Sequence, residues 1–120
     1  MAEPGFTITI PYPPTVNTYW RHVGSKVLIS REGRAYRELV WASFIEQRAS
    51  KITGDLAANI VLYPPDKRRR DLDNTMKAVL DGLQHAGAYD DDSQFKYLCL
   101  YWGEVFPGGK AVVTITKSNR

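Results

Sequence analysis

The chain has 120 residues, of which 43% are apolar and 24% are charged, and its formal net charge is +3. This length allows one hydrophobic core but not two independent ones, so we expect a single domain over residues 1–120. No stretch approaches the roughly 18 apolar residues of a membrane span, and the first residues lack the basic and apolar regions of a secretory signal. The composition therefore predicts a soluble, cytoplasmic protein, and the single cysteine, Cys99, excludes an intrachain disulfide.

The first half of the chain predicts a strand followed by a helix. Residues 6–10 alternate apolar and polar side chains, as in a half-buried strand, and prolines end the pattern from Pro11 onward. Residues 17–26 are expected to form a loop. Ser30 can cap a helix that runs to about Ala49. The apolar side chains of this helix recur at helical spacing, at Tyr36, Val40 and Phe44, with Leu39 beside them.

The second half predicts a strand, a helix and two further strands. Residues 56–63 alternate as a strand, and from Asp71 or Leu72 to Ala86 the apolar residues recur at helical spacing, with Gly87 as the stop. Residues 95–104 and 111–116 alternate again, and Pro107-Gly108-Gly109 between them predicts a hairpin. The predicted fold class is α+β in the order β-α-β-α-β-β, with a mixed sheet and two helices packed on it.

A cluster of basic residues runs directly into a cluster of acidic ones. The basic residues are Lys67, Arg68, Arg69 and Arg70, and the acidic ones are Asp71 and Asp73, followed later by Asp90, Asp91 and Asp92. Arginines bind phosphate, whereas carboxylates bind Mg²⁺ or Mn²⁺. The cations also precede a helix N-terminus, where the dipole disfavours each by about 0.3 to 1 kcal/mol and a bound phosphate would reverse that penalty. Metal-dependent cleavage of a phosphodiester requires such a junction of charges.

Helix phase predicts which of these side chains can meet. Asp73 and Lys77 lie one turn apart on the polar face, and Asp71 lies at the helix entry. A short turn and a strand running back alongside the helix would allow Asp92 to join them, so the spacing allows three converging carboxylates. An activated water would then be the nucleophile, and Lys77 would add positive charge at the phosphorane or at the leaving oxygen.

An ordinary charged surface explains the same residues without chemistry. In that interpretation Asp71 and Asp73 neutralise the helix dipole and pair with the preceding arginines. Asp-rich turns after helices are also common. From the residues alone, both interpretations stay open.

The segment from Pro64 to Asp92 resembles the RusA family of Holliday junction resolvases. The hallmark of that family is a basic run, Asp-Leu-Asp-Asn, a lysine three residues after the Asn, and a carboxylate in an Asp-Asp turn after the helix. Here these are Asp71-Leu72-Asp73-Asn74, Lys77 and Asp91-Asp92. Pro13-Pro14-Thr15-Val16-Asn17 is similar to the family's Pro-Pro-x-x-Asn element. Chain length and element order also agree, so the resemblance covers nearly the whole chain.

The resemblance implies a homodimeric crossover junction endodeoxyribonuclease that acts in DNA recombination and repair. Such an enzyme binds four-way DNA junctions and makes paired symmetric nicks with Mg²⁺, for which Mn²⁺ would substitute. Two cuts in strands of like polarity need two active sites related by a two-fold axis, which a symmetric dimer supplies. The setting would be the cytoplasm of a bacterial or phage-infected cell, where the substrate is the DNA of the nucleoid.

The motif match also implies a role for individual residues. Asp71, Asp73 and Asp92 would be the metal-binding catalytic carboxylates and Lys77 the catalytic lysine, with Asp91 and then Asp90 as the fallback for the third ligand. Asn17, Asn74 and Asp91 would support the site from beside it. Lys67, Arg68, Arg69 and Arg70 would contact DNA.

Two other functions would use the same residues. One is a non-catalytic protein that binds branched DNA, and the other is a metal-dependent nuclease for flaps or RNA. An aromatic and basic patch could stack on distorted bases or, equally, pack in the core or in a dimer interface. It consists of Tyr12, Tyr19, Trp20 and Arg21.

Overall fold

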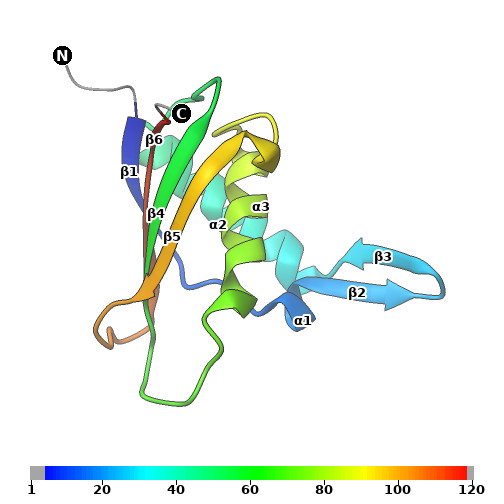
Figure 1. Ribbon diagram of the computed structural model, residues 1–120. Helices are drawn as coiled ribbons and strands as arrows, with labels where there is room; N and C mark the ends of the chain where they lie inside the picture. Colours follow the sequence, from blue (N-terminus) through cyan, green and yellow to red (C-terminus); the bar gives the residue numbers. More distant parts are fainter. Residues whose placement is uncertain (1–4, 119–120) are drawn as a thin grey trace.

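Four strands form one mixed sheet, and helices cover one of its faces (Figure 1). The computed structural model describes residues 5–118. The strands lie in the order β1-β6-β4-β5, which are Gly5–Ile10, Lys110–Lys117, Leu56–Tyr63 and Phe95–Trp102. β4 and β5 are parallel, whereas β6 pairs antiparallel with both β1 and β4. The predicted α+β class with a mixed sheet is therefore confirmed.

The two long helices begin and end at residues that explain their bounds. α2 spans Arg31–Glu46, and the hydroxyl of Ser30 caps it by accepting the Gly33 N–H at 2.9 Å. α3 spans Met76–Ala86 and ends at Gly87, whose φ of 100° suits glycine. α3 begins later than predicted because the preceding turn, η1 (Asp73–Thr75), is a 3₁₀ helix. The N–H and the hydroxyl of Thr75 both donate to the Leu72 carbonyl, which closes the tighter turn.

The predicted hairpin between the last two strands is wrong. β5 lies at the edge of the sheet and pairs with β4, whereas β6 crosses to lie between β1 and β4. Ala111, Val113 and Ile115 of β6 are fully buried, which is the environment of a central strand. The turn residues in the link permit a reversal of the chain, but the apolar face of β6 is better buried in the middle of the sheet.

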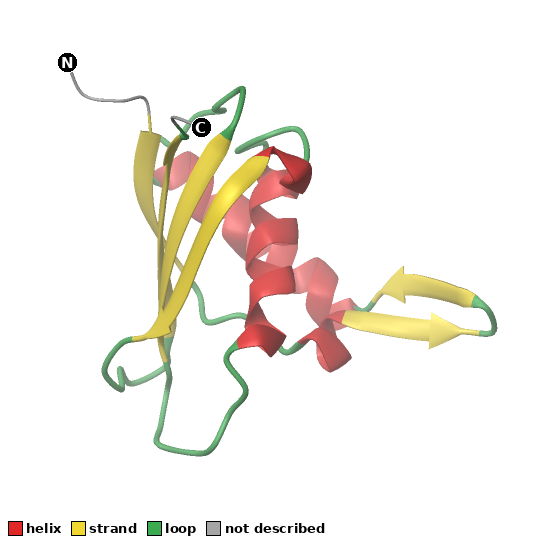
Figure 2. Ribbon diagram, viewed as in Figure 1, coloured by secondary structure: helices red, strands yellow, loops and turns green. Residues whose placement is uncertain are grey.

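The region predicted as a loop forms a short helix and a β-hairpin (Figure 2). α1 spans Val16–Tyr19, β2 spans Trp20–Val23 and β3 spans Lys26–Ile29. β2 and β3 pair only with each other, as a separate two-stranded sheet joined through Gly24 and Ser25. The hairpin projects away from the body of the molecule, and we call residues 20–29 the arm.

The core lies between the helices and the inward face of the sheet. Along β4, alternate residues from Leu56 to Leu62 are buried, as the sequence predicts. Tyr36, Val40 and Phe44 of α2 are buried as predicted, whereas Leu39 beside them is 53% exposed. Among the residues that the structure describes, no helix is long and apolar enough to cross a membrane.

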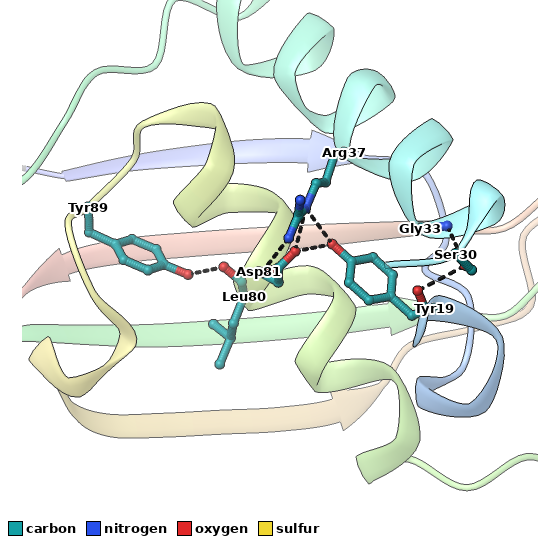
Figure 3. A network of polar contacts seen from close by, with 7 residues as sticks. All are labelled: Tyr19, Ser30, Gly33, Arg37, Leu80, Asp81 and Tyr89. Atoms are coloured by element: carbon teal, nitrogen blue, oxygen red, sulfur yellow. Dashed lines mark hydrogen bonds and ion pairs between the residues drawn. The ribbon is translucent and has the colours of Figure 1, made fainter. Parts of the chain in front are cut away.

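A polar network joins α1, α2 and α3 beside this core (Figure 3). The guanidinium of Arg37 donates to both carboxylate oxygens of Asp81, at 2.8 and 3.2 Å, and the hydroxyl of Tyr19 donates to the same carboxylate. Ser30 donates to the Tyr19 carbonyl at 2.9 Å while it caps α2. Burial, followed by the bond to Asp81, raises the pKa of the Tyr19 hydroxyl far above its usual value, so it stays a proton donor.

Two leucines provide a matched test of this core. Leu83 of α3 is fully buried, whereas Leu39 of α2 is largely exposed. We expect Leu83→Ala to lower the free energy of unfolding by about 2–5 kcal/mol, because it removes buried methyl groups and leaves a cavity. Leu39→Ala should change it by less than about 0.5 kcal/mol. Urea titrations of both variants measure the difference, and equal losses would contradict the packing described above.

Candidate active site

Two exposed aspartates and an exposed lysine lie at the start of α3. Asp71 precedes η1, Asp73 begins it, and Lys77 lies in the first turn of α3; all three are exposed. Asn74 donates to one carboxylate oxygen of Asp71 at 3.2 Å and so orients it. α1, which carries the exposed Asn17, packs against η1. The structure therefore places these five predicted residues at one end of α3.

The basic residues before Asp71 are not equivalent to one another. Arg70 is partly buried: it pairs with Asp66 at 2.8 Å, donates to the carbonyls of Asp66 and Arg68, and stacks over the Tyr12 ring at 5.9 Å. The bond from Arg70, and then that from the Arg68 backbone, holds the pKa of Asp66 well below its usual range. Arg70 thus fixes the shape of the loop, while Lys67, Arg68 and Arg69 are exposed on it.

A hollow of about 350 Å³ lies beside this loop, next to the end of β5. Its lining consists of Pro64, residues 66–70, Trp102 and Val105. Trp102 is 37% exposed, so it is not a core residue. The hollow combines cationic and aromatic side chains directly before the two aspartates.

The three consecutive aspartates have different roles in the turn before β5. Asp90 pairs with Lys51. Asp91 caps η2 (Asp92–Gln94) by accepting the Ser93 N–H at 3.0 Å, and its bonds from Ser93 lower its pKa. Asp92 is exposed, and its carboxylate makes no hydrogen bond or ion pair within residues 5–118; only its backbone carbonyl is bonded, to the Phe95 N–H. Of the three, Asp92 therefore has the carboxylate that is free to bind a ligand.

Asp92 lies at the opposite end of α3 from Asp71 and Asp73. Leu56 pairs with Phe95 and Leu62 with Trp102, so β5 starts where β4 starts, far from the segment that follows β4. From Asp73 to Ala86 the chain spans a 3₁₀ turn and the eleven residues of α3, a length of about 20 Å. Within residues 5–118, no three His, Cys, Asp or Glu side chains lie close enough to hold a metal ion. A single chain does not bring the three aspartates together.

Sequence reasoning missed two features near this site. One is Asp66, whose spacing of four residues from Arg70 could have indicated their ion pair. The other is the bidentate pair of Arg37 and Asp81, which lie in different helices and carry no local signal. The predicted aromatic and basic patch does not form one exposed surface. Tyr19 is buried and packs edge-to-face on Trp20, with ring centroids 5.0 Å apart, whereas Arg21 is exposed.

The chain is similar to known proteins along nearly its whole length. The model of a family described as Endodeoxyribonuclease RusA matches residues 11–116. A crossover junction endodeoxyribonuclease of Enterobacteria phage HK97 is 40% identical over 113 residues, which cover 93% of this chain and 94% of the relative. The protein of that name in Escherichia coli strain K12 is 39% identical over 114 residues, with the same coverage. One from Enterobacteria phage 82 is 40% identical over 114 residues, again covering 93% of this chain and 94% of its own. The chain therefore belongs to the RusA family of endodeoxyribonucleases.

Proposed function

We propose that this protein is a homodimeric, Mg²⁺- or Mn²⁺-dependent nuclease that resolves four-way DNA junctions by paired nicks during recombination and repair. The observation that carries the proposal is the exposed group of Asp71, Asp73 and Lys77 directly behind a cationic loop. The relatives named crossover junction endodeoxyribonucleases supply the substrate class. Such a substrate belongs in the cytoplasm of a bacterial or phage-infected cell.

The donor set suits a hard divalent cation. Asp71 and Asp73 offer exposed carboxylate oxygens, and Asn74 engages only one oxygen of Asp71. Oxygen donors of this kind are those that Mg²⁺ and Mn²⁺ prefer. When bound, the ion supplies a water of lowered pKa and neutralises charge on the phosphate.

The protein's own side chains then position the DNA and stabilise the charge that develops. Lys67 and Arg69 bind the backbone phosphates beside the cut. As the water oxygen bonds to phosphorus, the bond to the leaving sugar oxygen breaks, and the ammonium of Lys77 stabilises the charge on that oxygen. Asn74 keeps the Asp71 carboxylate oriented throughout.

We propose that the third carboxylate, Asp92, comes from the partner protomer. The edge strand β5 supports this arrangement, since its exposed side chains include Tyr97, Leu98 and Tyr101 and its outer edge has no partner strand among residues 5–118. An acidic run precedes β5, and the cationic loop lies beside its end. Antiparallel association of two copies along β5 would place each acidic end at the partner's cationic end, which is the self-complementary contact of a two-fold dimer.

The variant Asp73→Asn tests the metal-dependent chemistry. It removes one anionic oxygen donor but keeps the shape of the side chain, so we expect junction cleavage to fall by about 1,000-fold or more, while junction binding stays intact. Gel shifts in EDTA and single-turnover cleavage in Mg²⁺ measure the two effects. Asp55→Asn, the same change at an exposed aspartate before β4, serves as the control and should cleave normally.

Two results would contradict the metal-dependent mechanism. One is full cleavage by Asp73→Asn in Mg²⁺. The other is binding by the unaltered protein without cutting in any divalent metal, which would identify a non-catalytic junction-binding protein. Flap, duplex and RNA substrates run beside the four-way junction show whether the site belongs to a different nuclease.

Mixed dimers test whether Asp92 acts across the two-fold axis. Asp73→Asn and Asp92→Asn proteins should each be inactive alone. Co-expressed with different affinity tags and purified through both, the heterodimer has one doubly altered site and one intact site if Asp92 is contributed in trans. We therefore expect the heterodimer to make a single nick in each cruciform of a plasmid, where the wild-type dimer makes two, so that no paired cuts form. If Asp92 serves its own chain, both sites of the heterodimer are damaged and no nicks form.

A further inference from the structure

The arm exposes apolar side chains that nothing in the described part of the chain covers. Every residue from Arg21 to Leu28 is exposed, and Val23 at 43% and Leu28 at 44% lie on one face of the hairpin. A two-stranded hairpin without a core is only marginally stable by itself in water. Exposed apolar side chains gathered on such a projection indicate a surface that binds something.

The base of the arm, in contrast, is fixed on both sides. Ser30 donates to the carbonyls of Thr18 and Tyr19 at 2.6 and 2.9 Å, which ties the entry of β2 to the exit of β3. A Cβ at Gly33 would lie 2.5 Å from the Tyr19 carbonyl oxygen and 2.7 Å from the Ile29 side chain, so α2 packs tightly against the end of α1 and the end of β3. The arm therefore leaves the body in a defined direction.

That direction is set relative to the candidate active site. α1 leads directly into the arm and packs against η1, which begins with Asp73. Tyr19, the last residue of α1, is held by Asp81, which lies one turn after Lys77 on α3 (Figure 3). The same helix thus carries the proposed catalytic lysine and anchors the base of the arm.

The charge of the arm indicates its partner. The arm contains Arg21, Lys26 and His22 and no carboxylate. In the hairpin, Arg21 lies opposite Leu28 and Val23 opposite Lys26, so these four side chains share one face. Cations interleaved with apolar side chains on a two-stranded ribbon fit a nucleic acid groove, where cations bind phosphates and apolar groups contact bases. A protein partner would need a matching acidic and apolar surface.

We propose that the arm is a DNA-binding element that enters a groove beside the branch of the junction. Arg21 and Lys26 contact phosphates, while Val23 and Leu28 contact base edges or step between bases. This rests on the proposed function, because it adds a DNA contact to the same active site. The arm then sets the distance from the branch to the phosphate that is cut.

Variants on the two faces of the arm test the proposal. Lys26→Ala should reduce the slope of log K against log salt for junction binding by about 1, as expected for one lost phosphate contact. Leu28→Ser should reduce the preference for a four-way junction over duplex by about tenfold. Val27→Ser, which changes a 56% exposed valine on the opposite face, is the control and should bind and cleave as the unaltered protein does. All three positions are exposed, and circular dichroism checks the fold.

A crosslink locates the contact independently of affinity. In a Cys99→Ser background, Ser25→Cys gives a single thiol at the tip of the arm, to which a photoreactive reagent is attached. Irradiation with a labelled four-way junction should join the tip to nucleotides close to the branch. Crosslinks spread evenly along the four DNA duplexes of the junction would overturn the proposal. So would salt slopes and a preference for the junction over duplex that are unchanged in the variants.

Sedimentation of the same variants separates the remaining outcomes. If Leu28→Ser dissociates the protein into monomers, the arm binds a second copy instead of DNA and the proposal fails. If the unaltered protein cuts no junction in Mg²⁺ or Mn²⁺ but the tip still crosslinks at the branch, the arm proposal holds and the proposed nuclease function fails. If the unaltered protein cuts junctions and the arm variants match it in every measurement, the proposed nuclease function holds and the arm proposal fails.

Discussion

The parallel pairing of β4 with β5 is the constraint on which the arrangement of the proposed active site depends. Neighbouring parallel strands need a crossover, and α3 supplies it, so α3 starts beside the end of β4 and ends beside the start of β5. Asp71 and Asp73 precede this helix and Asp92 follows it. No choice of side-chain rotamer in one chain removes a separation of that size. In the dimer that we propose, a two-fold partner would supply the missing carboxylate to each site, which would give two equal sites for two cuts.

In the cationic loop, residues 66–70, the carboxylate of Asp66 determines which of the basic side chains are free to bind a phosphate. Arg70 is used within the loop, because Asp66 and two backbone carbonyls take its donors. Arg68 makes a longer contact with the same carboxylate at 3.3 Å and remains 80% exposed, so a phosphate could compete for it. In the function that we propose, the electrostatic attraction for DNA would therefore fall mainly to Lys67, Arg68 and Arg69, while Arg70 fixes the shape of the loop that carries them. Because the pKa of Asp66 is held low, its carboxylate stays charged, and the loop keeps its internal pairing, in more acidic solution than an ordinary aspartate would allow.

The sequence could predict those features that depend on neighbouring residues. The start of α2 at the Ser30 cap, the buried face of β4 and the stop at Gly87 follow from spacing and capping, and all are confirmed, whereas α2 ends at Glu46, three residues before the predicted end. The placement of β6 could not be predicted in this way, because turn residues indicate where the chain reverses but not which strand it pairs with. The arm was predicted as a loop because its strands are only four residues long, although Gly24-Ser25 between alternating residues is a hairpin signal. The position of Asp92 required the sheet topology, which sequence spacing leaves open.

The network around Asp81 illustrates why a polar contact can be retained where apolar packing would be as stable. Partly buried ion pairs lose much of their Coulombic energy to desolvation, so Arg37 and Asp81 contribute little net stability compared with well-packed apolar side chains. Their hydrogen bonds are directional, however, and the Asp81 carboxylate accepts from Arg37 and from Tyr19 together. This arrangement fixes α1 against α3 in rotation as well as in distance. The arm that we propose to bind DNA directly follows Tyr19 and would need that orientation, because a rotation at its base would move its tip relative to Asp73 and Lys77.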